Sequence, residues 1–238
     1  MSKRILLAMC CMLALSTSCA VGSRKQVTAT RGVSGFDQVV FEGLGEITIR
    51  QGDHEALTIT AESNVMKRIT SIVRGHALHI GYRGSVFGLH VVPTMPIRYE
   101  LTVRNIDGLD LTGLGSIFVG AIAADSLSVD LSGAGRVVLR ALSADRLDVN
   151  LSGLGSCQVA GQVQRQELLL TGGGNYDATD LASDRAVLTL TGLGKATVWA
   201  TEELDVTITG AGGVAYYGSP RVTQDVTGLG RVRSLVER

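Results

Sequence analysis

The chain has 238 residues, of which 22 are Lys or Arg and 22 are Asp or Glu, so it carries no formal net charge at pH 7. Hydrophobic residues make up 45% of it and charged residues 18%, with 30 glycines and only 3 prolines. This composition excludes collagen and simple disorder. The balanced charge leaves no overall field that would attract nucleic acid or an anionic membrane surface.

The first 18 residues have the pattern of an export signal. Two basic residues precede an uncharged stretch, residues 5–15, which is too short to span a bilayer, and small residues follow it. Cleavage before Cys19 would suit a lipoprotein signal peptidase, because LSTSC at residues 15–19 resembles a bacterial lipobox. The alternative is cleavage after Ala20. We favour the first, which makes Cys19 the lipidated N-terminus of an exported protein anchored in the outer membrane of the bacterial cell envelope.

Cysteine usage has a consequence for the folded part of the chain. Cys10 and Cys11 would leave with the signal at residues 1–18, so Cys157 remains alone after Cys19. No internal disulfide is then possible, and burial and backbone hydrogen bonds must hold the domain together. Residues 19–31 contain few apolar side chains and are expected to form a flexible tether.

A glycine motif repeats through the second half of the chain. Ser or Thr followed by Gly-x-Gly occurs seven times, with the first glycine at residues 113, 133, 153, 172, 192, 210 and 228. The spacings are 20, 20, 19, 20, 18 and 18 residues. Such regular spacing indicates a repeat architecture. The first glycine of each motif is called position 0 below.

Apolar residues alternate with polar ones on both sides of the glycines. Positions −4 and −2, and positions +4 and +6, are apolar in nearly every repeat. A period of two is typical of a half-buried strand, so each repeat predicts a strand, a glycine corner and a second strand. We expect the apolar or small residue at position +1 to point inward at the corner. The Ser or Thr at position −1 should form a ladder of hydroxyls from coil to coil.

These features predict an all-β fold, a parallel β-helix with coils of about 20 residues over residues 106–238. Residues 32–105 contain the same unit once, around Gly43 and Gly45, and are otherwise less regular. We expect about three diverged coils there, with a longer insertion near residues 84–96. The diverged and regular coils should form one continuous body.

The sequence resembles a known family of bacterial envelope proteins, the "putative auto-transporter adhesin, head GIN domain" family. The resemblance covers about residues 33–235 and rests on GFDQVVFEGLGEITIRQGD, PIRYELTVRNIDGLDLTGLGSI and the run of Ser/Thr-Gly-x-Gly units. It implies a right-handed β-helix, often preceded by a lipoprotein or secretion signal. No catalytic residues are established for this family, so the resemblance implies none here.

Neither a nucleotide nor a metal ion is expected as a ligand, and no cofactor is expected. A Gly-x-Gly turn that cradles phosphate is followed by a helix, whereas here a strand follows each turn. The four histidines are His54, His76, His79 and His90, and they show no metal-binding spacing.

An enzyme acting on polysaccharides is the competing class. Some β-helix proteins cleave acidic polysaccharides, and the outward columns offer carboxylates, namely Asp110, Asp130, Asp148, Glu167 and Asp205. However, the links between the strands are too short to build the long loops that carry such active sites. Carboxylates on an outward strand face are more often solvated charges. We therefore favour a non-enzymatic binding protein over a lyase or glycosidase.

Two aromatic residues are the candidate ligand contacts. Trp199, the single tryptophan, and Tyr217 both fall at position +7 of neighbouring repeats, in a column that also contains Thr179. Stacked, exposed aromatic rings suit the apolar face of a sugar. The alternative is that a turn or a crossing loop covers both rings. We expect an envelope-anchored surface that binds a partner protein or a glycan.

Overall fold

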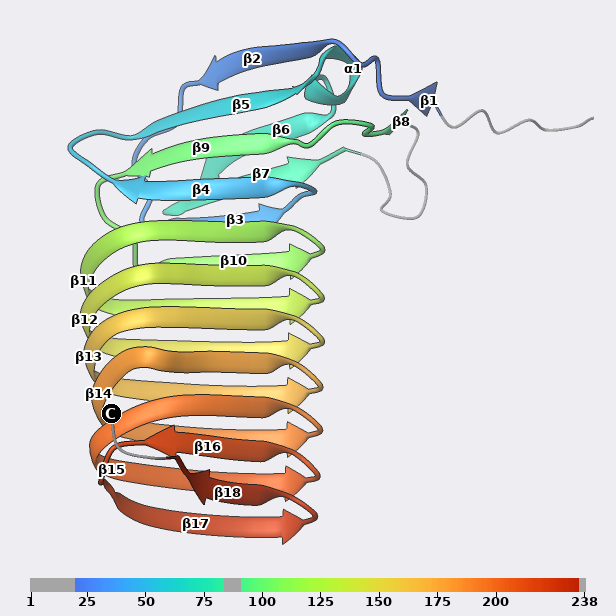
Figure 1. Ribbon diagram of the computed structural model, residues 1–238. Helices are drawn as coiled ribbons and strands as arrows, with labels where there is room; N and C mark the ends of the chain where they lie inside the picture. Colours follow the sequence, from blue (N-terminus) through green and yellow to red (C-terminus); the bar gives the residue numbers. More distant parts are fainter. Residues whose placement is uncertain (1–19, 84–90, 236–238) are drawn as a thin grey trace, which may run out of the picture.

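The computed structural model describes residues 20–83 and 91–235, which form a β-solenoid with a cap of further strands at its N-terminal end (Figure 1). The coils lie about 20 residues apart, make about six turns and wind in a right-handed sense. The predicted all-β, right-handed parallel β-helix is therefore confirmed. The signal peptide expected at residues 1–18, Cys19, His90 and most of the expected insertion lie outside the described residues, as do residues 236–238.

The regular coils consist of strands that pair in parallel with the coils above and below them. They are β10 (Gly108–Gly113), β11 (Ser116–Gly133), β12 (Arg136–Gly153), β13 (Ser156–Gly172), β14 (Asn175–Gly192), β15 (Lys195–Gly210), β16 (Gly213–Tyr217), β17 (Arg221–Gly228) and β18 (Arg231–Ser234). Each long strand bends halfway, so that one half lies on the front of the solenoid and the other on the back (Figure 1). Every coil therefore has two edges, the bend and the glycine corner.

Positions −4, −2, +4 and +6 point into the solenoid, as predicted. Before the last coil the side chains there are at most 4% exposed, apart from the half-buried Tyr216. Equivalent positions stack on one another, so the interior is one continuous hydrophobic core. In the last coil Gln224 stands at position −4 and is exposed, which gives this end of the stack a more polar surface.

The two glycines of each motif have different tasks. The first glycine has φ between +111° and +127° in all seven motifs, a conformation that residues with a side chain rarely adopt. The second glycine faces the core, where a Cβ at Gly155 would lie 2.6 Å from Cδ2 of Leu131. Because the second glycine faces inward, the residue between the two glycines points outward. The expected inward orientation of position +1 is wrong: Leu154 is 75% exposed and Leu229 is 83% exposed.

The cap consists of shorter strands and one short helix. They are β1 (Ala20–Val21), β2 (Gln26–Arg31), β3 (Gln38–Glu42), β4 (Glu46–Gln51), β5 (Ala56–Glu62), α1 (Ser63–Met66), β6 (Ile69–Arg74), β7 (Ala77–Tyr82), β8 (Val91–Val92) and β9 (Arg98–Val103). β3 and β4 flank the Gly43-Leu44-Gly45 corner and form a coil directly above the regular ones, because they pair in parallel with β10 and β11. β7 and β9 pair in parallel with β3 and β4 and form the next layer.

The cap differs from the expected series of diverged coils. Its layers do not follow chain order. Three of its strand pairs are antiparallel, namely β2 with β5, β5 with β9, and β6 with β7. A period of two in the sequence does not reveal strand direction, because parallel and antiparallel strands both bury alternate residues. Residues 26–31, expected in the flexible tether, form β2 instead.

A buried carboxylate holds the N-terminal arm against the cap. Glu62 is 1% exposed and accepts hydrogen bonds from the backbone N–H groups of Arg24 (2.7 Å), Thr94 (2.7 Å) and Met95 (3.2 Å). The Thr94 hydroxyl also donates to it (2.6 Å). This hydroxyl and the backbone donors lower the pKa of Glu62 to about 2, against the opposing effect of burial. The chain is therefore fixed to the domain almost from Ala20 onward.

Candidate binding surface

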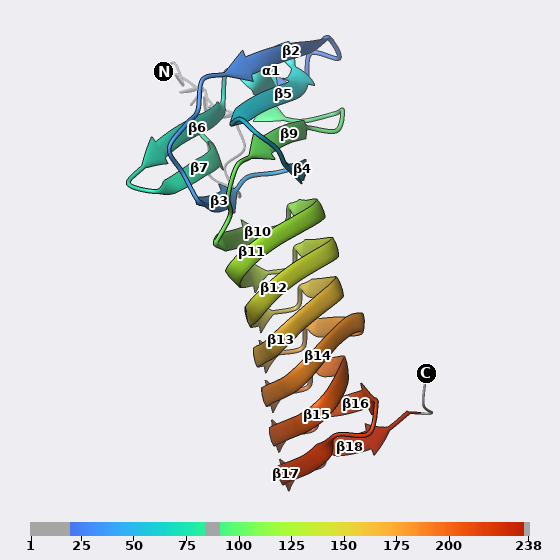
Figure 2. The same cartoon turned by 90° about the vertical axis from the view of Figure 1, so that its left-hand side faces the viewer.

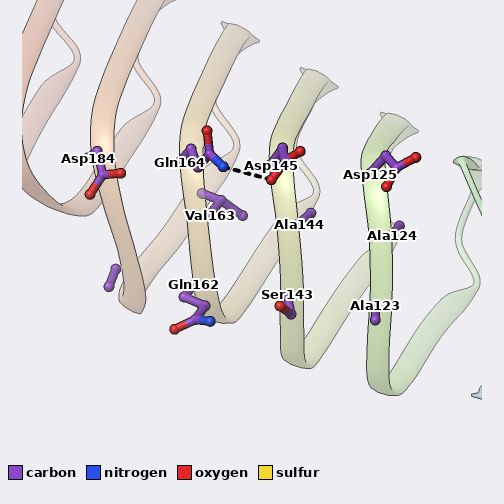
Figure 3. A pocket seen from close by; sticks show the side chains of 11 residues that line it. Ala123, Ala124, Asp125, Ser143, Ala144, Asp145, Gln162, Val163, Gln164 and Asp184 are labelled. Atoms are coloured by element: carbon purple, nitrogen blue, oxygen red, sulfur yellow. Dashed lines mark hydrogen bonds between the residues drawn. The ribbon is translucent and has the colours of Figure 1, made fainter.

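A groove runs along the edge of the solenoid where the long strands bend, the edge that faces the viewer in Figure 2. Its volume is about 580 Å³. One row of lining residues consists of Ala123, Ser143, Gln162 and Ala182, and a second consists of Asp125, Asp145, Gln164 and Asp184 (Figure 3). Small or apolar side chains lie between the rows, namely Ala124, Ala144 and Val163. Successive members of a row come from successive coils, so they repeat about every 4.8 Å.

Hydrogen bonds fix parts of the groove. Gln164 donates from Nε2 to Oδ1 of Asp145 (2.8 Å; Figure 3). At the N-terminal end, the Gln51 side chain donates to the carbonyl of Ala123 (3.1 Å) and accepts from its N–H (2.9 Å). The carboxylates of the second row are solvent-exposed. Their remaining oxygen lone pairs can therefore accept hydrogen bonds from a ligand.

The two candidate aromatic residues extend the first row of the groove. Trp199 is in register with Ala182, and Tyr217 is in register with Trp199. The sequence thus placed the two aromatics correctly on neighbouring coils. It wrongly placed Thr179 above Trp199, because the register between β14 and β15 jumps from Ala178 to Ala182. The three residues in between form a bulge in β14, and β15 has one extra residue between Ala200 and Glu203. The net difference of two residues lets a coil of 18 residues follow one of 20.

Both rings occupy outward positions and are half-buried. Behind the indole, the carbonyl of Trp199 accepts a hydrogen bond from the hydroxyl of Ser183 (2.9 Å). Ser183 in turn accepts from Nε2 of Gln166 (2.7 Å), whose Oε1 accepts from the Tyr176 hydroxyl (3.0 Å). Ser183, Gln166 and Tyr176 are each 1% exposed. This buried network holds the backbone that carries Trp199, so the ring is presented by a rigid element.

Beside the groove, arginines and carboxylates form a ladder of ion pairs on the outward sheet face. Arg146 contacts Asp148 (2.7 Å) and Glu167 (3.0 Å), and Arg165 contacts Glu167 (2.6 Å). Further along the stack, Glu203 pairs with Arg185 and Arg221. Asp148 and Glu167, which the sequence left open as catalytic candidates, are thus partners of arginines from their own and adjacent coils.

Asp110 and Asp130 occupy the next column of this face. Asp110 accepts a hydrogen bond from the Thr112 hydroxyl (3.2 Å), and Asp130 accepts one from Nδ2 of Asn150 (3.2 Å). Burial, more than the neighbouring carboxylates, raises the pKa of Asp110. In the predicted hydroxyl ladder, Ser132 donates to Thr112 (3.2 Å).

The ionisable groups of the groove lie on one side of it. Its three carboxylates all lie in one row, and the opposite row contains no ionisable group. Within residues 20–83 and 91–235, no three or more His, Cys, Asp or Glu side chains gather in a way that could hold a metal ion. No helix of this same part has the length and apolar character of a membrane span.

The fold and the groove define a right-handed β-helix domain with a polar groove along one edge. Residues 35–220 match the family "Putative auto-transporter adhesin, head GIN domain", and the chain belongs to this family. The description of the family names a "putative" adhesin and no enzymatic activity. No curated protein matches the sequence.

Solved structures from Bacteroides and Parabacteroides have a similar fold. A "putative adhesin" from Bacteroides fragilis superimposes with a TM-score of 0.84 at 24% identity, over 90% of this chain and 99% of its own. A "putative lipid binding protein" from Parabacteroides distasonis gives 0.75 at 22% identity, over 91% and 99%. A "putative adhesin" from Parabacteroides merdae gives 0.72 at 20% identity, also over 91% and 99%. At these identities the likeness shows the fold alone.

Proposed function

We propose that this protein is a non-enzymatic, envelope-anchored binding domain whose bend-edge groove and aromatic pair hold a glycan. The observation that carries the proposal is the register of the first row, which leads from Ala123 without interruption to Trp199 and Tyr217. One column of paired residues thus combines a groove lined by carboxylates and amides with two outward aromatic rings.

The chemistry of the two parts suits a polyhydroxylated chain. Carboxylate and amide oxygens accept hydrogen bonds from hydroxyl groups, and Asp125, Asp145, Gln164 and Asp184 repeat them coil by coil. The faces of Trp199 and Tyr217 can pack against the apolar face of a sugar ring. A rigid groove loses little conformational freedom when it binds. The adhesin names of the family and of two structural relatives agree with a binding role.

Replacing Trp199 by alanine tests the proposal. A chain that begins at Ala20 retains the single tryptophan, so its fluorescence should change when a glycan identified by array screening is added. Trp199→Ala should weaken binding about 5- to 150-fold, the equivalent of 1–3 kcal/mol for an aromatic contact, and leave the circular dichroism spectrum unchanged. Phe118→Ala, which removes a half-buried outward aromatic from another face, is the matched control and should bind normally.

Three results would contradict the glycan proposal. One is undiminished glycan binding by Trp199→Ala. Another is a partner protein that competes for the same groove in envelope extracts while no glycan binds. The third is an emission maximum typical of a fully buried indole in the free protein. It would show that Trp199 does not contact the sugar, because a covered ring cannot do so.

We further propose that Cys19 carries the lipid that anchors the domain in the outer membrane. The export signal and LSTSC at residues 15–19 support this reading. Cys19→Ser should move the protein from the membrane fraction to the soluble fraction, since the acyl chains supply the attachment. Mass spectrometry of the mature N-terminus checks the assignment. An unlipidated N-terminus at Val21 would show that cleavage follows Ala20 instead.

A further inference from the structure

The glycine-corner edge of the solenoid carries a line of exposed leucines. Leu114, Leu154, Leu193 and Leu229 stand at position +1 of alternate coils and are 64%, 75%, 70% and 83% exposed. The coils between them have Ala134, Gly173 and Ala211 at the same position. The corners stack one below another along the right-hand edge in Figure 1. These leucines, called the leucine ridge below, therefore lie along one line about 29 Å long, six coil spacings.

One flank of the leucine ridge is locally basic although the whole chain carries no formal net charge. On one side, position −1 is Ser or Thr in all seven regular motifs. On the other side, position +3 includes exposed Arg136, Lys195 and Arg231, and the rest are Ser, Asn or Gly. In the seven regular motifs neither column contains a carboxylate, whereas the Gly43 corner above them has Glu42 and Glu46 at these two positions. Within the described part of the chain, none of these three cations forms an ion pair.

We propose that the leucine ridge docks on the surface of a bilayer that contains anionic lipids. Leucine side chains on a straight, rigid edge can enter the headgroup–acyl boundary together, because all of them reach one plane at once. The long side chains of Arg136, Lys195 and Arg231 then lie level with the phosphates. The hydroxyls of position −1 remain hydrogen-bonded in the polar interface.

The position of the N-terminal arm agrees with this orientation. β1, the first described strand, lies on the same side of the molecule as the glycine corners (Figure 1). The groove and Trp199 lie at the opposite edge of the coils, so a ridge that rests on the membrane leaves the proposed glycan surface facing away from it. The docking proposal does not depend on which ligand that surface takes.

A second copy of the chain is the other possible occupant, and the charges disfavour it. In an antiparallel pair whose leucines fill the small-residue positions opposite them, Arg136 of one copy faces Lys195 of the other. In a parallel pair, leucine meets leucine and gaps remain opposite Ala134, Gly173 and Ala211. A fluid bilayer has no fixed shape to match and supplies the negative charge that both arrangements lack.

Vesicle flotation tests the proposal with a chain that begins at Ala20 and so lacks any acyl anchor. Residues 20–235 contain one continuous core, so this chain is expected to fold. It should float with vesicles of phosphatidylcholine and phosphatidylglycerol, and bind those of phosphatidylcholine alone more weakly. Replacing both Leu154 and Leu193 by serine should weaken binding about tenfold or more. Leu169→Ser, which changes an exposed leucine on another face, should bind like the wild type.

A charge-reversal pair separates the two contributions. Arg136→Glu combined with Lys195→Glu should abolish the preference for phosphatidylglycerol, while Arg140→Glu at another exposed position should preserve it. No flotation of the wild type would overturn the proposal, and so would full binding by the double serine variant with circular dichroism unchanged. A dimer in solution that Leu154→Ser and Leu193→Ser dissociate would assign the leucine ridge to a second copy instead. Normal flotation of Trp199→Ala keeps this result independent of glycan binding.

Discussion

Gly153→Ala should destabilise the protein by about 2–5 kcal/mol, a larger loss of stability than Gly113→Ala should cause. Gly153 has φ +116°, a sparsely populated conformation that costs an alanine about 1–3 kcal/mol. A Cβ there would also lie 2.5 Å from the carbonyl oxygen of Gly133. That oxygen accepts the corner hydrogen bond from the N–H of Leu154 (2.9 Å), so the new methyl group would push apart two coils at the point where they are joined.

The chain offers a control that separates the two costs. Gly113 has nearly the same φ, +112°, but no atom lies within 4 Å of the place of its Cβ. Gly113→Ala should therefore show only the backbone cost, about 1–3 kcal/mol. Urea unfolding followed by circular dichroism measures both variants. Equal losses at Gly113 and Gly153 would show that contact between the corners contributes nothing, and a neutral Gly153→Ala would disprove the corner geometry itself.

The regular part of the fold could be predicted because each coil repeats the same constraints. A positive φ at every corner requires glycine, and stacked strands require the same positions to be apolar in every coil. The sequence therefore shows both the spacing of about 20 residues and the core columns at −4, −2, +4 and +6. Cys157 at position +4 follows this rule, since it is buried like Val137 above it and Tyr176 below it.

Features that depend on three-dimensional register could not be predicted by counting along the chain. The leucines at position +1 point outward although the sequence predicts that they point inward. The sequence does not show which of the two corner glycines faces the core. The groove could not be predicted from the sequence either, because bulges near Ala160 and near Thr179 shift the columns of residues that form it. Gln166 did leave a signal, because it is polar in a column otherwise filled by residues such as Leu127 and Leu147.

Candidate residues on the surface were only partly predictable for a related reason. The pairing of Trp199 with Tyr217 follows from the 18-residue spacing of the last coils, which contain no register shift between these two residues. Their link to the groove required the jump from Ala178 to Ala182, and a bulge has no fixed sequence pattern. The sequence shows the charged residues of the ion-pair ladder, but it does not show which of them pair with one another.

Cys157→Asp should cost roughly 3–5 kcal/mol at neutral pH, because it places a carboxylate in the core without a partner. Cys157 is 1% exposed, and burial raises the pKa of its thiol to about 12. The same environment should raise the pKa of an aspartate above its unfolded value of about 3.9. Below that unfolded pKa the side chain is neutral in both states, so the extra loss due to charge is absent there. It should grow as the pH rises and be complete above the folded-state pKa.

Unfolding of Cys157→Asp in urea at several pH values measures this loss, and Cys157→Val is the control because valine fills the same column at residue 137. The valine variant should stay within about 1 kcal/mol of the wild type at every pH, since it changes volume slightly and adds no polar group. In the chain that begins at Ala20, Cys157 is the single thiol, so it should react with a thiol reagent only as fast as the surrounding coils open. Rapid labelling in native buffer, or an aspartate variant as stable as the valine one at pH 7, would place position +4 of this coil outside the core.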